Sequence, residues 1–510
     1  MGETVKGGAG TFTIAYLGVL ASLQLVDPTV ANTALVQAGR SLGMEDATLT
    51  LAASVSTLAQ AASVLVLGFL GDRLGRRRVL AGSLLLAIGG NLLALAAPVV
   101  AMFLLGRALT GIALGGVLAL SFAAVRDCCR PERLAWALGL WNLVILVGFL
   151  VGSLLGGWLA DGAWRLALAL VPLLCLLALP LLGVLLPATP AQPALRADVP
   201  GLLSIAAAMV LTLWGVSHAV EGLQSRSFWL PSLGGLLLFG VHGLIEHRRR
   251  EPIFPLALYR RGPFLAAVLS GIGWNFAQAA VQLQTSNFWQ VVQHLRTSQV
   301  ALAQVPLLVC FGAGGVLAGR LMGPGRRTGR LLGWGGALLV AGLLLLTPIQ
   351  ATSTVASLQP ALLLVGLGLA FVAVPQSALF VQEAPERCFG VVTAFRTTTG
   401  QLGFASGFAV SGALVHGFGL ADLRQRLLAQ GIPPTTLPAL LERGRAFLNH
   451  GLPAGAPLPP PEPLRAMQQA HAAGVAGAMA VTALAVAVLL AVSVGLVGKG
   501  TGTRASAEGG

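Results

Sequence analysis

The sequence predicts an all-α integral membrane protein in which fourteen spanning helices form two six-helix bundles and an inserted pair. Of its 510 residues, 55% are hydrophobic and only 10% are charged, and the mean hydropathy is +0.82. A soluble domain has roughly 25% charged residues, so this composition excludes an ordinary soluble protein. Mostly apolar runs of about 20 residues, long enough to cross a bilayer, recur fourteen times along the chain.

The apolar runs are grouped into domains by two features. A segment rich in proline and alanine follows span 6, and the loop after span 10, GRLMGPGRR, is similar to the turn after span 2, as expected of two six-helix halves. The N-terminal bundle, 12–186, contains spans near 12–34, 47–69, 79–98, 102–124, 135–157 and 165–186. A linker and the inserted helices occupy 187–262, with spans near 199–219 and 229–246. Residues 497–510 form a tail. The C-terminal bundle, 263–496, contains spans near 264–289, 299–320, 329–348, 357–380, 388–416 and 472–496.

The basic residues predict the orientation of these spans. The net charge is +14, and arginines concentrate in the loops after spans 2, 4, 8 and 10, whereas each short loop on the opposite side holds at most one. Because Lys and Arg favour the cytoplasmic side, we expect both termini in the cytoplasm. The arginines are not interleaved with aromatic residues, so the expected partner is the lipid bilayer and not nucleic acid.

Two segments outside the spans have distinct compositions. Residues 187–198 (PATPAQPALRAD) are rich in proline and alanine and predict a linker. Residues 417–471 form the longest predicted loop, which we place outside the cell, although 420–429 and 437–448 have helical periodicity. A lid, a partner site and a spacer are all compatible with this loop, and we prefer the spacer.

The first predicted span contains an acid, Asp27, in the stretch VDPTVANTAL. At a rise of about 1.5 Å per residue, it lies about 22 Å from Phe12, within the ~30 Å apolar core. A buried carboxylate is costly unless it is paired, protonated or facing water, so we prefer a functional role over an acid at the interface. Asn32 extends the polar face of the same helix.

Arg107 in span 4 is predicted to lie at about the depth of Asp27. The two side chains are therefore expected to pair or to share a water-filled cavity. An arginine that extends its guanidinium to the outer interface is the alternative.

Two glycine patterns point to conformational roles. The turn after span 2 reads GFLGDRLGRRRVL, and the spacing of its members is more specific than that of an ordinary basic loop; we select Gly68, Asp72, Arg73, Gly75 and Arg76. In span 5, three glycines that are four residues apart allow a neighbouring helix to approach closely. Static packing and a rocking interface are the two interpretations of this pattern. The glycines are Gly148, Gly152 and Gly156.

Span 9 has a stripe of amide and indole side chains at helical spacing. Such groups suit a ligand that is partly apolar and partly polar, and packing between helices is the alternative. The selected members, which extend the site begun by Asn32, are Trp274, Asn275, Gln278, Gln282 and Trp289.

Several chemistries have no signature in the sequence. There is no GxxxxGK[ST] phosphate loop, so ATP-driven transport by this chain alone is not expected. Neither a catalytic triad nor a metal-ligand cluster is present, and the five cysteines include no CxxC pair. The chain therefore reads as a non-enzyme without a metal site or other cofactor.

These motifs together resemble the major facilitator superfamily, specifically its fourteen-helix drug:proton antiporter branch. GFLGDRLGRRRVL is similar to the loop motif after helix 2, and VDPTVANTAL to the helix 1 signature. LLGRALTGIALGG resembles the helix 4 motif, in which Arg107 takes the proton-coupling position, and GFLVGSLLGGW resembles the antiporter motif of helix 5. Further similarity lies at Pro131–Trp141, Trp164–Pro172 and Ala384–Phe395. The resemblance covers nearly the whole chain except 417–471 and implies a major facilitator fold.

Three positions depart from the family pattern. Ser153 stands where the helix 5 motif usually has proline, and Thr110 where the helix 4 motif often has glutamine. The stretch RTTTGQLG at 396–403 lacks the acid that some exporters of quaternary cations carry. The resemblance therefore implies neutral or weakly charged lipophilic substrates, not dications.

The residues and the resemblance together predict a multi-pass protein of the bacterial inner membrane. Its expected function is that of an antiporter that is driven by the proton gradient and exports lipophilic drugs or toxic small molecules by alternating access. In the expected cycle, Asp27 takes a proton from outside and releases it inside, Arg107 tunes that step, and Asp72 and Arg76 latch the cytoplasmic side. We expect a monomer. The alternatives are a dedicated exporter of an endogenous metabolite or antibiotic, a proton-driven importer, and a non-transporting sensor or scaffold, against which the buried charges argue.

Overall fold

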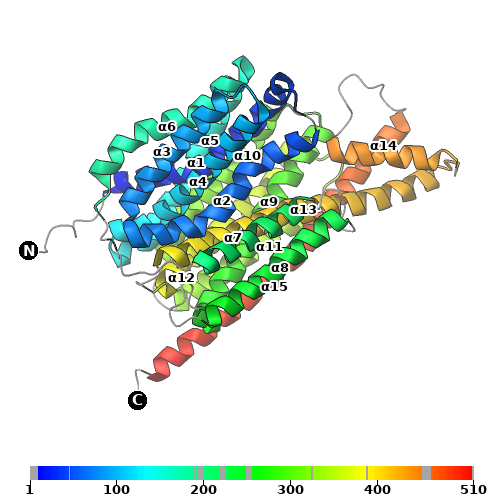
Figure 1. Ribbon diagram of the computed structural model, residues 1–510. Coiled ribbons are helices and arrows are strands. Elements are labelled where there is room, and N and C mark those ends of the chain that lie inside the picture. The colour runs from blue at the N-terminus through cyan, green and yellow to red at the C-terminus, as the bar shows by residue number, and fades with distance from the viewer. Residues whose placement is uncertain are drawn as a thin grey trace, which may run out of the picture.

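The computed structural model describes residues 10–44, 46–188, 191, 199–218, 225–248, 256–322, 326–385, 389–433, 435–450 and 461–507. These residues are helical apart from short connections, and they include no strand (Figure 1). Fourteen of the described helices are long and apolar enough to cross a membrane. The predicted all-α class and the predicted number of spans are therefore confirmed.

The N-terminal bundle consists of six helices that follow the predicted spans. Their apolar sequences run between short connections, and α2 passes into α3 through the single residue Gly75, whose φ of 94° is one that side chains other than glycine rarely tolerate. The bundle comprises α1 (Thr11–Leu42), α2 (Asp46–Leu74), α3 (Arg76–Leu95), α4 (Val100–Cys128), α5 (Leu134–Gly162) and α6 (Trp164–Leu185).

The C-terminal bundle has six spanning helices and one shorter helix, α14. The last helix, α15, continues through the predicted tail as far as Ala507, and it ends at the lower left of Figure 1, opposite α14. The elements are α9 (Gly262–Val291), α10 (Thr297–Leu321), α11 (Arg326–Leu345), α12 (Val355–Glu383), α13 (Phe389–Ala429), α14 (Leu437–His450) and α15 (Pro461–Ala507).

The two bundles pack against each other along two helix pairs, α5 with α10 and α2 with α13. Between α5 and α10, a Cβ atom added to Gly139 would lie only 2.4 Å from the carbonyl oxygen of Gly315. The absence of side chains at this point thus lets the two backbones touch. This contact lies near the start of α5 and the end of α10, so it is at the same end of the molecule as Gly75.

The inserted helices α7 (Val199–Ser217) and α8 (Arg226–His247) form a hairpin that contacts both bundles. Met209 and Leu213 of α7 pack against Ala61 of α2, and Val216 packs against Ala409 of α13. The hairpin therefore covers the seam between α2 and α13. Most of the predicted linker at 187–198 lies outside the described residues.

The segment 417–471, predicted as a loop, is largely helical, which corrects that expectation. Helix α13 continues to Ala429, and α14 and the first turns of α15 follow. The helical periodicity at 420–429 and 437–448 is thereby confirmed. These pieces project together at the right of Figure 1 and share a small core anchored on Val291 of α9, which comprises Leu423, Leu427, Phe447, Ala466, Met467 and Ala470.

Candidate functional site

The helices of both bundles run between two opposite ends of the molecule. The "Arg76 end" is the end at which α2 passes into α3 and α4 ends at Cys128. The "α14 end" is the opposite end, from which α14 projects (Figure 1).

Asp27 and Arg107 form an ion pair inside the N-terminal bundle. Arg107 Nη1 lies 2.8 Å from Oδ2 and 2.9 Å from Oδ1 of Asp27, and the two side chains are only 1% and 2% exposed. Ser56 and Asn91 also donate to the carboxylate, at 3.4 and 3.3 Å. The four residues come from α2, α3, α4 and α1, so the predicted pairing is present and four helices converge on one carboxylate.

Helix α1 is held beside α5 by the predicted glycine stripe. Cβ atoms added at Gly148, Gly152 and Gly156 would lie 2.5, 2.6 and 2.2 Å from side-chain atoms of α1. Those atoms belong to Ser22, Val26 and Val30, which flank Asp27 along the helix. The stripe thus fixes α1 within its own bundle and does not lie between the bundles, and a gating role for it stays a prediction.

Substituting Gly152 by alanine is expected to destabilise the protein by about 1–3 kcal/mol, because the new methyl group overlaps Val26 in a packed interface. Thermal unfolding in detergent measures the effect. Gly240→Ala is the matched control, because a Cβ atom at that position on α8 meets nothing within 4 Å. Equal stability of the two variants would contradict the packing role of the stripe.

The turn between α2 and α3 is held by a network centred on Arg76. Its guanidinium lies 3.1 Å from Asp72 and also forms an ion pair with Asp127, at the end of α4. A Cβ atom on Gly71 would lie 2.2 Å from Leu120 of α4. Gly68 is buried within α2, and Arg73 is half-buried. Asp127, which the sequence did not single out, therefore ties the turn to a third helix.

The same network reaches the other bundle through an aromatic ring. Phe389, the first residue of α13, has the guanidinium carbons of Arg76 and Arg126 at 5.0 and 4.2 Å from its ring centroid. Such cation–π contacts are attractive when the charge is removed from water. At the Arg76 end, arginines of the N-terminal bundle thus contact an aromatic ring of the C-terminal bundle.

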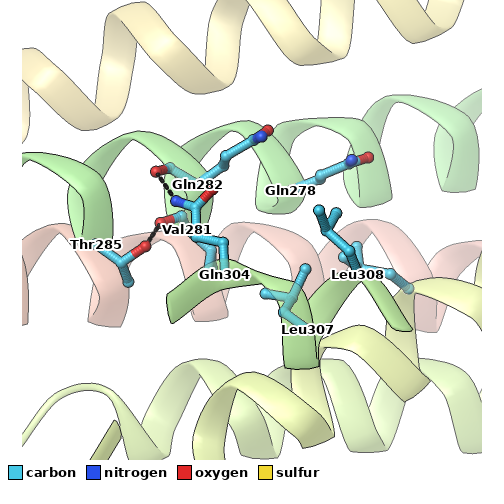
Figure 2. A pocket seen from close by; sticks show the side chains of 8 residues that line it. Gln278, Val281, Gln282, Thr285, Gln304, Leu307 and Leu308 are labelled. Carbon is cyan, nitrogen blue, oxygen red and sulfur yellow. Dashed lines mark hydrogen bonds between the residues drawn. The ribbon is translucent and has the colours of Figure 1, made fainter. Parts of the chain in front are cut away.

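Two members of the predicted stripe on α9 line a small, partly open cavity of about 10 Å³, roughly the space of one water molecule (Figure 2). Gln278 and Gln282 share it with Gln304 of α10, whose amide donates to the Gln282 carbonyl oxygen at 3.0 Å and to Ser286 Oγ at 2.7 Å. Apolar walls are supplied by leucines of α10 and α12, including Leu307 and Leu308. The cavity thus combines amides with aliphatic surface.

The other members of the predicted substrate site lie elsewhere. Trp274 and Trp289 are 8% and 0% exposed, and Asn275 donates to the Gly271 carbonyl oxygen in its own helix at 2.8 Å. None of the three lines the cavity. The side chain of Asn32 is outside the described part of the structure. Across the described residues, no group of three or more His, Cys, Asp and Glu side chains could hold a metal ion.

Sequence reasoning missed the neutral partners of Asp27 and the amide of α10 that bonds to Gln282 and Ser286. Ser56, Asn91 and Gln304 are single polar residues in otherwise apolar spans, which is a weak but readable signal. Phe389 had no such signal, because an aromatic residue at a helix start is unremarkable in a membrane protein.

The sequence matches the family model of the Major Facilitator Superfamily over residues 13–408. Puromycin resistance protein pur8 of Streptomyces alboniger is 29% identical over 401 residues, which cover 76% of this chain and 78% of that protein. The tetracenomycin C resistance and export protein of Streptomyces glaucescens is 27% identical, over 70% of this chain and 67% of that protein. Multidrug resistance protein Stp of Mycobacterium tuberculosis is 26% identical, over 81% of this chain and 78% of that protein.

Solved structures show the same fold. The human organic anion transporter MFSD10 (TETRAN) aligns with a TM-score of 0.58 at 16% identity, covering 94% of this chain and 98% of that one. The proton:xylose symporter XylE aligns with a TM-score of 0.55 at 15% identity, covering 93% and 94%. At such identities the likeness establishes the fold alone.

Proposed function

Because the chain belongs to the Major Facilitator Superfamily, we propose that it is a proton-coupled antiporter that exports lipophilic drugs or toxic small molecules across the bacterial inner membrane by alternating access. The observation that carries this proposal is the buried ion pair of Asp27 and Arg107. Ionisable side chains inside a membrane are costly and mark ion or proton pathways. The names of the relatives, which include resistance and export, agree with outward movement of toxic compounds.

The ion pair supplies the coupling in this proposal. Removing one charge of a buried pair costs about 3–5 kcal/mol, because the partner is left uncompensated. Protonation of Asp27 cancels its charge and so disfavours the arrangement in which Arg107, Asn91 and Ser56 surround the carboxylate. A proton that binds from outside and leaves inside therefore biases the bundles between two states, which is the requirement for coupled transport.

The Arg76 end is the cytoplasmic end in this proposal, with both termini inside. The basic turn at Arg76 supports the assignment through the positive-inside preference. The contacts of Arg76 and Arg126 with Phe389 then close the cytoplasmic side, so that the structure corresponds to the outward-facing form. Gln278, Gln282 and Gln304 are the proposed contacts for substrate, and the protein acts as a monomer.

Replacing Arg76 by alanine is expected to favour separation of the bundles at the Arg76 end by about 1–3 kcal/mol, the usual size of such couplings. The variant loses two ion pairs and the contact with Phe389. Spin labels at the exposed positions Arg78 and Gln382 measure the distance between the bundles. Arg77→Ala is the control, since Arg77 bonds to the Leu186 carbonyl oxygen in its own bundle. An unchanged distance distribution in Arg76→Ala would rule out the latch.

A second candidate is a dedicated exporter of one antibiotic or metabolite. The relatives named for resistance to puromycin and for tetracenomycin C resistance and export favour it. A panel of lipophilic compounds tested on an efflux-deficient strain separates the two candidates. Resistance to several unrelated compounds supports a multidrug exporter, and resistance to a single compound supports a dedicated one.

Reconstituted liposomes test the proposed function directly. With an imposed proton gradient, a compound selected from the panel is expected to move against the direction of proton flow, and a protonophore is expected to stop this movement. Movement in the same direction as protons would identify an importer. Absence of any proton-dependent flux would favour the sensor or scaffold alternative.

A further inference from the structure

The seam between the bundles at the Arg76 end has cation–π contacts in both directions. Besides the two N-terminal arginines on Phe389, Arg396 of α13 projects the opposite way. Its guanidinium carbon lies 4.4 Å from the ring centroid of Phe122 in α4 and 5.6 Å from that of Trp141 in α5. Arg396 is seven residues beyond Phe389, or about 10 Å deeper along the helix. It is therefore a cation of the C-terminal bundle that lies against two aromatic rings of the N-terminal bundle.

Arg396 differs electrostatically from Arg76 and Arg107, the two other arginines that are buried among the described residues. It is only 9% exposed, its Nε donates to Ser377 Oγ at 2.9 Å, and in the described part of the chain no carboxylate pairs with it. Arg76 and Arg107, by contrast, each have an acidic partner. A buried charge ordinarily needs an opposite charge, and ring faces and one hydroxyl compensate a guanidinium only partly.

The neighbouring polar atoms are also of the kind that an anion would satisfy. Trp141 Nε1 is buried without a hydrogen-bond partner among the described residues, and so is the hydroxyl oxygen of the adjacent Thr397. An indole N–H can only donate. The Arg396 guanidinium, the Trp141 indole and the Ser377 hydroxyl thus lie together where the described residues supply no negative charge.

We propose that Arg396 is a substrate-binding residue and that the exported compounds include lipophilic monoanions, such as aromatic carboxylates and sulfonates. This inference rests on the proposed function and adds the substrate class to it. When the bundles part at the Arg76 end, Arg396 loses the faces of Phe122 and Trp141. An anionic group then takes their place on the guanidinium, while the apolar body of the substrate contacts the two exposed rings.

The exchange of partners on Arg396 gives the substrate a way to act on the conformation. Rings and anion compete for the same guanidinium, so the anion binds the open form better than the closed one. A ligand shifts a conformational equilibrium only through such differential affinity. Return of the rings during closure then displaces the anion toward the other side of the membrane.

A matched pair of probes tests the proposal. 8-Anilino-1-naphthalenesulfonate is a lipophilic monoanion, and N-phenyl-1-naphthylamine is the same skeleton without the sulfonate. Proton-driven transport of both is measured in liposomes that contain the full chain or its Arg396→Gln variant. We expect the variant to lose about tenfold in apparent affinity for the sulfonate, the effect of one charge-assisted contact. A shift of the bundles caused by the lost ring contacts would affect both probes alike, so the ratio of the two apparent affinities is the readout, and continued transport of the amine shows that the variant is folded.

Two further variants complete the test. Arg396→Lys keeps the positive charge but lacks the planar guanidinium with its paired N–H donors, so it is expected to retain part of the sulfonate transport. Arg165 is another arginine whose guanidinium carbon lies over a ring, 4.2 Å from the centroid of Trp164, but it lies away from the seam. The Arg165→Gln variant is therefore expected to transport both probes normally. An equal effect of Arg396→Gln on both probes, or none on either, overturns the inference. So does a full chain that transports only the amine, although the proposed exporter function then stands. A full chain that transports neither probe but exports another compound of the panel overturns the inference and leaves the exporter function standing, whereas a chain that exports no compound at all overturns both.

Discussion

Replacing Asp27 by asparagine is expected to abolish pH-driven export while leaving the protein folded. Asparagine has nearly the size of aspartate and keeps an oxygen that can accept from Arg107, but it cannot take up and release a proton. In an efflux-deficient strain, the susceptibility of cells that produce the variant should return to that of cells without the transporter. Immunoblots of the membrane fraction check that the two proteins are present in equal amounts.

The matched control for this substitution is Asp27→Glu, which keeps a titratable carboxylate. It is expected to retain part of the export, because the carboxylate can still take up and release a proton. The rest is expected to be lost, because the longer side chain must fit between four packed helices to reach Arg107. Export by Asp27→Asn at the wild-type level would show that this carboxylate does not couple proton and substrate movement.

Replacing Arg107 by alanine is expected to cause the second large effect, a loss of both export and stability. The Asp27 carboxylate would then be buried with only Asn91 and Ser56 as donors. Breaking a buried pair by removing one partner costs about 3–5 kcal/mol. Thermal unfolding of the purified protein in detergent measures this cost.

A double-variant cycle separates the charge effect from the loss of packing. Combining Arg107→Ala with Asp27→Asn removes the uncompensated charge, so part of the stability should return although export does not. If the two substitutions lowered stability additively, the pair would contribute no interaction energy, and its role as a coupled unit would be lost.

Much of the fold could be predicted from sequence, because a membrane imposes strong rules on composition. Every apolar run of about 20 residues became a helix that can span the bilayer. The depth of Asp27 and Arg107 followed from the fixed rise per residue, and the two side chains indeed meet. Charged residues in apolar runs are rare, so they are conspicuous without a structure.

The partners that come from distant helices could not be predicted, because nothing in the sequence specifies which faces of the helices meet. Asn91 and Ser56 reach Asp27 only once α2 and α3 have packed beside α1. The stripe on α9 has regular spacing, but α12, α13 and α15 pack along the same helix. Trp289 is therefore completely buried, whereas Gln278 lines a cavity.

The segment 417–471 shows a different limit of sequence reasoning. Its helical periodicity at 420–429 and 437–448 is visible in the sequence, but its position between the last two apolar runs predicts a loop. The structure stabilises it with a small core that joins Leu423 and Phe447 with Met467. Those contacts are between residues far apart in sequence, so periodicity alone could not reveal them.

Proton release on substrate binding tests the central claim most directly. Purified protein in weakly buffered detergent solution, with a pH indicator, is mixed with a compound that the chain exports. If proton and substrate compete through Asp27, addition of the compound should release protons from the wild-type protein and none from Asp27→Asn, although the variant still binds the compound. Equal proton release from both proteins, or none from the wild type across the pH range in which it exports, would contradict the account.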